Sequence, residues 1–149
     1  MFGLFKKKLL FCDSWDVKPH DFVFYPMEGR MNDVHLGCSR ESLSVFGKPD
    51  SSEKVEADYL RLLYGDSILE CSSKLEYIGT HLQNAQVIIN RNEIKRGMTM
   101  SQIHELVGVP DSKDDQDADD VIYYYKRGGL TIELEFDLVG LNRVNCYPT

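Results

Sequence analysis

The chain of 149 residues has the length of one ordinary domain, and its 42% hydrophobic and 28% charged residues are typical of a folded globular protein. With 17 Lys and Arg against 24 Asp and Glu, the net charge is −7, which excludes the basic surface of an ordinary nucleic-acid binder. We therefore expect a basic protein as the partner, and no nucleic acid.

Residues 1–19 are predicted to be an extension ahead of the folded part. Lys6–Lys8 are followed by only three apolar residues, Leu9–Phe11, whereas a secretory signal needs about 7–15. No other apolar run approaches the roughly 18 residues of a membrane span. We expect a cytoplasmic protein with no stable membrane insertion. A weak membrane tether through the apolar residues of Phe2–Phe5 remains the alternative to a flexible start.

Residues 20–86 are predicted to contain one short helix followed by antiparallel strands. Ser39 is a residue type that begins helices, Leu43 and Phe46 lie one turn apart, and Gly47 with Pro49 is a typical helix end. β-Branched and aromatic residues predict the strands. These are Phe22–Tyr25, Tyr59–Tyr64, Ser67–Cys71 and Leu75–Thr80.

Residues 87–149 show the same order of elements. Thr99 and Gln102 have the spacing of a capping box, and Gly108 with Pro110 ends the predicted helix. Apolar and polar residues alternate through Leu130–Phe136, so one face of that strand is expected to be buried and the other wet. The predicted strands are Val87–Asn90, Val121–Tyr125, Leu130–Phe136 and Arg143–Tyr147.

The two segments are also similar residue by residue. Residues 32–43 match residues 92–103 at an offset of 60, and Phe46–Ser51 then matches Val107–Ser112 at an offset of 61. A unit of this size buries too little surface on folding to be stable by itself. We therefore predict an α+β fold with two tandem helix-then-antiparallel-sheet repeats, 20–86 and 87–149. The repeats pack as one cooperative body with the helices on one sheet face.

The stretch G-M-T-M-S-Q-I-H-E-L-V-G-V-P-D at Gly97–Asp111, with the Tyr-rich and alternating strands after it, resembles the β-lactamase-inhibitor-protein-like fold. That group includes small outer-membrane assembly lipoprotein domains. The first copy is degenerate, with G-C-S at Gly37–Ser39 in place of G-M-T. Tandem duplication resembles the inhibitor branch. The resemblance implies a protein that binds another protein on the open face of its sheet.

The sequence offers little for catalysis or cofactor binding. The four histidines are scattered, and no catalytic or phosphate-binding motif is present. The four cysteines include no C-x-x-C, so we expect free thiols and no zinc site. Asp115, Asp117 and Asp119 suggest calcium, but Asp120 and Lys126 stand where an EF-hand needs Gly and Glu. We predict no enzyme activity, cofactor or metal.

Two groups of residues are candidates for binding the partner. The first is the acidic run Asp111–Asp120, which is either a solvated loop or a surface that steers a basic partner. Its candidate residues are Asp114, Asp115, Asp117 and Asp119.

The second group lies on the strands. If Leu60, Leu62, Val121 and Tyr123 face the helices, their neighbours face outward; the alternative is that the tyrosine-rich strand packs against the helices. The outward candidates are Arg61, Leu63, Ile122, Tyr124, Glu133 and Glu135. Trp15 either fills the core or contacts the partner.

From these features we predict a non-enzymatic cytoplasmic binding protein that inhibits another protein by covering its active surface. The specific form is an immunity protein that neutralises a bacterial toxin, such as a basic nuclease, in a toxin-antitoxin or contact-dependent growth inhibition system. The alternative is a structural or assembly factor near the cell envelope. The oligomeric state is not predicted.

Overall fold

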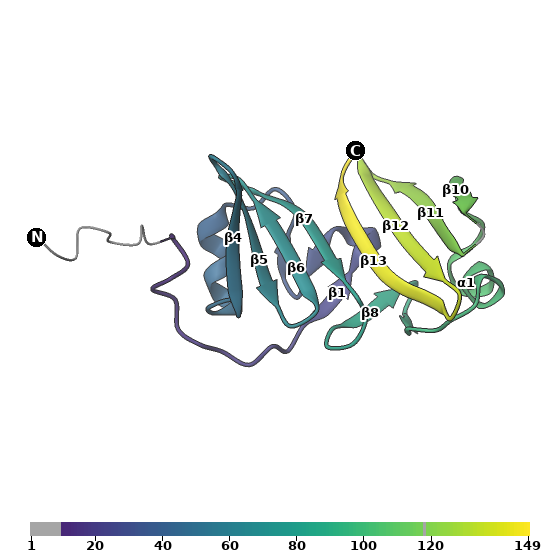
Figure 1. The fold of residues 1–149 in the computed structure, drawn as a ribbon, viewed down its shortest axis with the longest axis horizontal. Helices are drawn as coiled ribbons and strands as arrows, with labels where there is room; N and C mark the ends of the chain where they lie inside the picture. Colours follow the sequence, from purple (N-terminus) through teal and green to yellow (C-terminus); the bar gives the residue numbers. More distant parts are fainter. Residues whose placement is uncertain (1–9, 118) are drawn as a thin grey trace, which may run out of the picture.

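Two β-sheets surround one hydrophobic core in the computed structural model, which describes residues 10–117 and 119–149 (Figure 1). The smaller sheet has the strand order β3-β2-β1-β8-β9. Its strands are β1 (Val23–Tyr25), β2 (Arg30–Met31), β3 (Val34–His35), β8 (Gln86–Ile89) and β9 (Asn92–Ile94). β1 and β8 pair in parallel at its centre, although about 60 residues separate them in the sequence.

The larger sheet is antiparallel throughout and has the strand order β10-β11-β12-β13-β7-β6-β5-β4. Its strands are β4 (Ser51–Glu56), β5 (Tyr59–Tyr64), β6 (Ser67–Cys71), β7 (Leu75–Thr80), β10 (Ser112–Asp117), β11 (Asp120–Arg127), β12 (Leu130–Asp137) and β13 (Gly140–Pro148). The central pair, β7 with β13, joins the two halves of the chain into one sheet.

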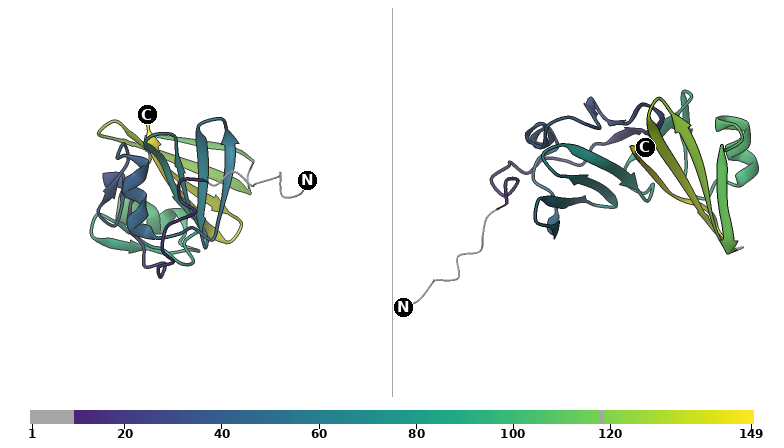
Figure 2. Two further views of the ribbon diagram at one scale, coloured as in Figure 1. Left: turned by 90° about the vertical axis from the view of Figure 1, so that its left-hand side faces the viewer. Right: turned by 90° about the horizontal axis from the view of Figure 1, so that it is seen from above.

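The helical segments are short, and both longer ones pack on the same face of the larger sheet (Figure 2). They are the 3-10 turns η1 (Pro26–Glu28) and η2 (Arg40–Phe46) and the α-helix α1 (Met100–Val107). Phe46 of η2 lies against Tyr64 of β5, and His104 of α1 stacks on Tyr123 of β11. No helix among the described residues is both long and apolar enough to cross a membrane.

The predicted α+β architecture of two helix-then-sheet repeats is wrong. The protein is mostly β, with one five-stranded and one eight-stranded sheet. The helix predicted after Ser39 is a 3-10 segment, because the Ser39 hydroxyl contacts the Ser42 hydroxyl at 3.0 Å instead of capping a backbone amide. The polar stretches that follow Pro49 and Pro110, where no strand was predicted, form the edge strands β4 and β10, whose backbones pair with β5 and β11.

Short-range hydrogen bonds nevertheless recur in the two halves. In each half, a buried tyrosine donates to the glycine carbonyl that ends the helix, and an aspartate after that glycine accepts a hairpin amide. The bonds are Tyr64 to Gly47 (2.7 Å), Tyr125 to Gly108 (2.8 Å), Gly65 to Asp50 (2.6 Å) and Lys126 to Asp111 (2.7 Å). The sequence repeat is thus reflected in local contacts, while its boundaries at 20–86 and 87–149 stay a prediction.

The capping box predicted for the second helix is confirmed and gives a measurable contribution to stability. The Thr99 hydroxyl accepts from the Gln102 amide at 3.1 Å, and the Gln102 side chain accepts from the Thr99 amide at 2.9 Å.

Thr99→Ala is expected to lower the free energy of unfolding by about 1 kcal/mol in chemical denaturation. Ser101→Ala, at an exposed position in the first turn of α1, is the control and should change the free energy of unfolding by less than about 0.5 kcal/mol. Equal losses from both would contradict the capping role.

Candidate functional site

The larger sheet has one covered face and one open face. On β11, the side chains of Val121, Tyr123 and Tyr125 are buried against the core, and those of Ile122 and Tyr124 point to the other side. β5 alternates in the same way. The structure places the outward candidates on the open face, as the alternation predicts; their role in binding stays a prediction. They are Arg61, Leu63, Ile122, Tyr124, Glu133 and Glu135.

The open-face candidates do not form a single patch. Arg61 and Leu63 lie on β5, Ile122 and Tyr124 lie on β11, and four strands separate β5 from β11. At the usual strand spacing this is roughly 24 Å across the sheet. Between them lie β12, β13, β7 and β6, with the seam where β13 pairs with β7 at the centre; the sequence could not identify this pairing.

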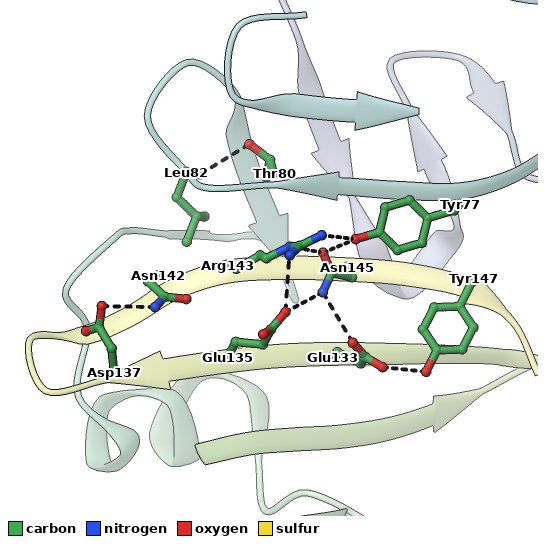
Figure 3. Close-up of polar contacts among 10 residues, drawn as sticks. All are labelled: Tyr77, Thr80, Leu82, Glu133, Glu135, Asp137, Asn142, Arg143, Asn145 and Tyr147. Atoms are coloured by element: carbon green, nitrogen blue, oxygen red, sulfur yellow. Dashed lines mark hydrogen bonds and ion pairs between the residues drawn. The ribbon is translucent and has the colours of Figure 1, made fainter. Parts of the chain in front are cut away.

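A hydrogen-bonded network centred on Asn145 occupies this seam (Figure 3). The Asn145 Oδ1 accepts from the Tyr77 hydroxyl at 2.6 Å and from Arg143 Nε at 2.9 Å. Its Nδ2 donates to Glu135 at 2.7 Å and to Glu133 at 3.2 Å. Asn145 is 2% exposed, so this one amide links β12, β13 and β7 in a nearly dry setting.

The network also fixes the tyrosines at its rim. Arg143 Nη2 donates to the Tyr77 hydroxyl at 2.6 Å, and the Tyr147 hydroxyl donates to Glu133 at 2.5 Å. Arg143 lies 3.6 Å from the Glu135 carboxylate. Every polar group of the cluster therefore has a partner, and the side chains are held in one arrangement.

A second charged cluster lies on the open face farther from the seam. Arg61 donates to Glu70 at 2.7 Å and to Glu53 at 2.6 Å, and the Tyr59 hydroxyl donates to Glu70 at 3.0 Å. The two acids outnumber the single cation. The open face is therefore acidic here as well.

Buried tyrosines predict how stability depends on alkaline pH. Burial raises the pKa of Tyr77 and of Tyr125 to about 12, from an ordinary value near 10. Burial also raises the pKa of Tyr147, and its hydrogen bond to Glu133 adds to the effect. The folded protein thus keeps protons that the unfolded chain loses. This stabilisation is complete below pH 10 and is lost as the pH rises from 10 toward 12.

We therefore expect the free energy of unfolding to fall steeply above about pH 10. The measurement is denaturant unfolding from about pH 9 to 12, with tyrosinate ionisation followed by near-ultraviolet absorbance. Most tyrosines should ionise together with the loss of structure. Full ionisation near pH 10 with the circular dichroism spectrum unchanged would contradict the burial argument.

Three shallow hollows adjoin the open face or its hairpin tip. One, of about 490 Å³, lies at the seam between β13 and β7. A second, of about 370 Å³, lies beside it on β11 and β12 and shares Tyr147. The third is next to the exposed Leu138 and Val139 at the tip of the β12–β13 hairpin. The seam hollow is lined by Tyr59, Glu76, Tyr77, Glu133, Tyr147 and Pro148.

The acidic run, for which one interpretation of the sequence was a solvated loop, forms an exposed edge strand and a turn. Residues Ser112–Asp117 form the edge strand β10, where charges discourage pairing with another chain. Asp114 lies opposite Ile122, on the open face. Asp115 contacts Lys113 at 3.1 Å, and Lys113 lies opposite the inward-facing Tyr123.

The remaining candidates in this run are at the turn. The Asp117 carboxylate accepts the amide of Asp119 at 3.1 Å. The four aspartates are therefore distributed over both faces and the turn of one hairpin, and only Asp114 belongs to the open face. Steering by the whole run is still consistent with this geometry, because steering acts at long range.

Trp15 lies outside the open face. Its ring packs edge-on against Phe11 at 5.2 Å, and the two rest on the core near η2, where Arg40 lies over the Phe11 ring at 4.8 Å. This favours the interpretation of Trp15 as part of the packing. The apolar residues of Phe2–Phe5 and Lys6–Lys8 lie outside the described residues.

Among the described residues, no group of three or more His, Cys, Asp or Glu side chains is arranged to hold a metal ion. All four cysteines are free, and burial raises the pKa of Cys146 and Cys71. His20 lies 3.4 Å from Asp50, just before β4, and stacks on Phe22, so its side chain takes part in packing.

Sequence reasoning missed the residues at the centre of the network. Arg143 and Tyr147 belong to a strand that was predicted, and their alternation with Val144 and Cys146 would have placed them on the wet face. Asn145 was missed because a buried polar residue carries no signal in a hydrophobic pattern. Tyr77 could not be found at all, because its position depends on the pairing of β7 with β13.

Comparison with known proteins supports the fold alone. The sequence matches no family model, and no curated protein matches it. A solved structure of a DUF4309 family protein, YjgB from Bacillus subtilis, is similar to this chain with a TM-score of 0.58. The match covers 83% of this chain and 90% of that chain at 13% identity. These comparisons do not support the resemblance to β-lactamase-inhibitor proteins, which stays a prediction.

Proposed function

We propose that this protein is a non-enzymatic binding protein that covers a surface of a basic partner protein with the open face of its eight-stranded sheet. The observation that carries the proposal is the arrangement of that face. Tyrosines, glutamates and arginines are held there by hydrogen bonds, and no described helix or strand lies over them (Figure 2). Ordered Tyr and Arg side chains on a broad surface are typical of binding energy concentrated in a few contacts.

The charge of the face indicates the chemistry of the partner. Acidic side chains outnumber basic ones on and beside the open face, and the whole chain has a net charge of −7. The acids are Glu53, Glu70, Glu76, Glu133, Glu135 and Asp114, and the bases are Arg61, Lys126 and Arg143. A basic partner would be attracted over a distance of about one Debye length, roughly 8–10 Å.

The specific form of the proposal is an inhibitor that acts by occlusion, such as a cytoplasmic immunity protein against a basic bacterial toxin. Acidic side chains would occupy the cationic surface that the toxin uses, and the aromatic contacts would slow dissociation. This action needs rigid, preformed side chains and no turnover, which agrees with the fully hydrogen-bonded network at the seam.

Site-specific photo-crosslinking tests the proposed face. A photoreactive phenylalanine analogue is placed at Tyr124 or at Leu63 on the open face, or at Glu105 of α1 or Val45 of η2 as matched controls on the covered side. In the producing cells, the two open-face positions should give the same cross-linked protein, and the control positions should not. Adducts from the control positions, or none from the open face, would contradict the proposal.

The charge argument has its own measurement once the cross-linked partner is purified. Association should slow as salt is raised, because screening weakens the attraction between oppositely charged surfaces. An association rate that is independent of salt would exclude a basic partner surface.

A further inference from the structure

The hollow at the seam has a composition that selects one kind of ligand. It measures about 490 Å³ and is lined by three tyrosines, two glutamates and one proline. Tyr77 comes from β7 and Tyr147 from β13, so each half of the chain contributes one side. No basic side chain lines it among the described residues. The lining consists of π-electron faces and carboxylates, both of which attract cations.

The aromatic rings are held in place. The planes of Tyr77 and Tyr147 lie within 13° of parallel, with their centroids 6.4 Å apart, so the two rings face the same direction. Their hydroxyls are fixed by Arg143 and by Glu133 (Figure 3). A ligand that stacks on these rings would not have to immobilise them, which lowers the entropic cost of binding.

The carboxylates of the hollow differ from those in the rest of the open face. Glu53 and Glu70 pair with Arg61, and Glu135 lies 3.6 Å from Arg143. By contrast, the two oxygens of Glu133 accept from Asn145 and Tyr147, which are neutral.

Glu76 is exposed at the other side of the hollow. Within the described part of the chain, neither Glu76 nor Glu133 forms an ion pair with a basic residue. The two carboxylates at this hollow thus lack a basic partner among the described residues, whereas Glu53, Glu70 and Glu135 each have an arginine beside them.

We propose that this hollow binds the guanidinium group of an arginine side chain on the partner. The inference rests on the proposed function and names the contact at its centre. Guanidinium is planar, so it stacks on tyrosine faces, and its N–H groups pair with two carboxylates at once. An ammonium group offers only a compact point charge and fits this lining less well.

A short peptide tests the hollow without the partner. The protein is labelled with fluorotyrosine, the resonances are assigned by Tyr→Phe variants, and Gly-Arg-Gly is titrated by NMR. We expect saturable shifts of Tyr59, Tyr77 and Tyr147, with a dissociation constant of roughly 1 mM. Gly-citrulline-Gly has the same shape without the charge and should bind at least about tenfold more weakly. Gly-Lys-Gly should also bind more weakly than Gly-Arg-Gly.

Variants locate the site. Glu76→Gln removes one charge at the rim and should weaken Gly-Arg-Gly about threefold to tenfold. Glu93→Gln on β9 is the control, because Glu93 is an exposed glutamate of the smaller sheet, and it should leave binding unchanged. Equal effects of the two variants, equal binding of arginine and citrulline peptides, or tighter binding of the lysine peptide would overturn the proposal.

The two proposals can fail separately. If Gly-Arg-Gly does not bind while Tyr124 and Leu63 still cross-link to one partner, the hollow is not an arginine site and the binding face stands. If the peptide binds but the open face gives no cross-linked protein, the hollow recognises guanidinium and the proposed function is wrong.

Discussion

Gly140→Ala is expected to lower the free energy of unfolding by about 3 kcal/mol or more. Gly140 begins β13 with φ at +117°, a conformation that side chains rarely adopt. A Cβ atom there would lie 2.5 Å from the Gly97 carbonyl oxygen and 2.8 Å from that of Met98. These are backbone atoms, so no side chain can move aside.

The backbone around Gly140 lies close to Gly97 and Met98 because two hydrogen bonds join these segments, and the substitution would weaken them as well. The Gly97 amide donates to the Leu141 carbonyl at 2.7 Å, and the Leu141 amide donates to the Met98 carbonyl at 2.8 Å. The β12–β13 hairpin is thereby joined to the loop that leads into α1. Moving the two backbones apart would weaken both bonds.

Gly128→Ala is the matched control. Gly128 is also in a left-handed conformation, with φ at +53°, but a Cβ there would meet nothing within 4 Å. Gly128→Ala should lower the free energy of unfolding by about 1 kcal/mol, because only the left-handed backbone conformation disfavours alanine there. Chemical denaturation measures both variants. Similar losses for the two would show that the contact with Gly97 is not what restricts position 140.

Asn145→Ala is expected to lower the free energy of unfolding by about 2–4 kcal/mol, because it removes the centre of the seam network. Glu133 and Glu135 would lose the amide that donates to both of them. Tyr77 and Arg143 would lose a common acceptor. The carboxylates are only partly exposed, so water replaces the lost bonds incompletely.

Asn142→Ala on the same strand is the control, because Asn142 makes one side-chain bond, to the exposed Asp137 at 2.9 Å. It should cost less than about 1 kcal/mol. Denaturant unfolding gives both values, and the tyrosine NMR signals report on the network directly. If Asn145→Ala leaves the Tyr77 and Tyr147 signals and the stability unchanged, the network does not hold the seam together.

Several strands were predicted with their observed bounds. Tyr59–Tyr64, Ser67–Cys71 and Leu75–Thr80 are strands as predicted, and Leu130–Asp137 exceeds its prediction by one residue. Their pattern of apolar and polar residues is set by burial on one side, which the sequence records directly. The capping box of α1 was found for a similar reason, since it depends on residues only three positions apart.

The edge strands of the larger sheet and the short outer strands of the smaller sheet escaped prediction, whereas the central strands β1 and β8 were predicted to within two residues. β10 is polar throughout, and β4 is polar apart from the exposed Val55, so neither strand shows an alternation of apolar and polar residues. β2, β3 and β9 have only two or three residues each. Such segments become strands because a partner backbone lies beside them, and that is a tertiary effect.

Local patterns in the sequence determined the longer strands with one buried face, where α1 begins and ends, and which side chains of those strands face the solvent. They did so because alternation and capping act over a few residues. Only the tertiary structure decided that β7 pairs with β13, that Asn145 lies among Tyr77, Glu133 and Glu135, and that a tyrosine-lined hollow forms there. The contact between Asn145 and Tyr77 joins residues 68 positions apart, and no short-range pattern encodes which strand will lie beside β13.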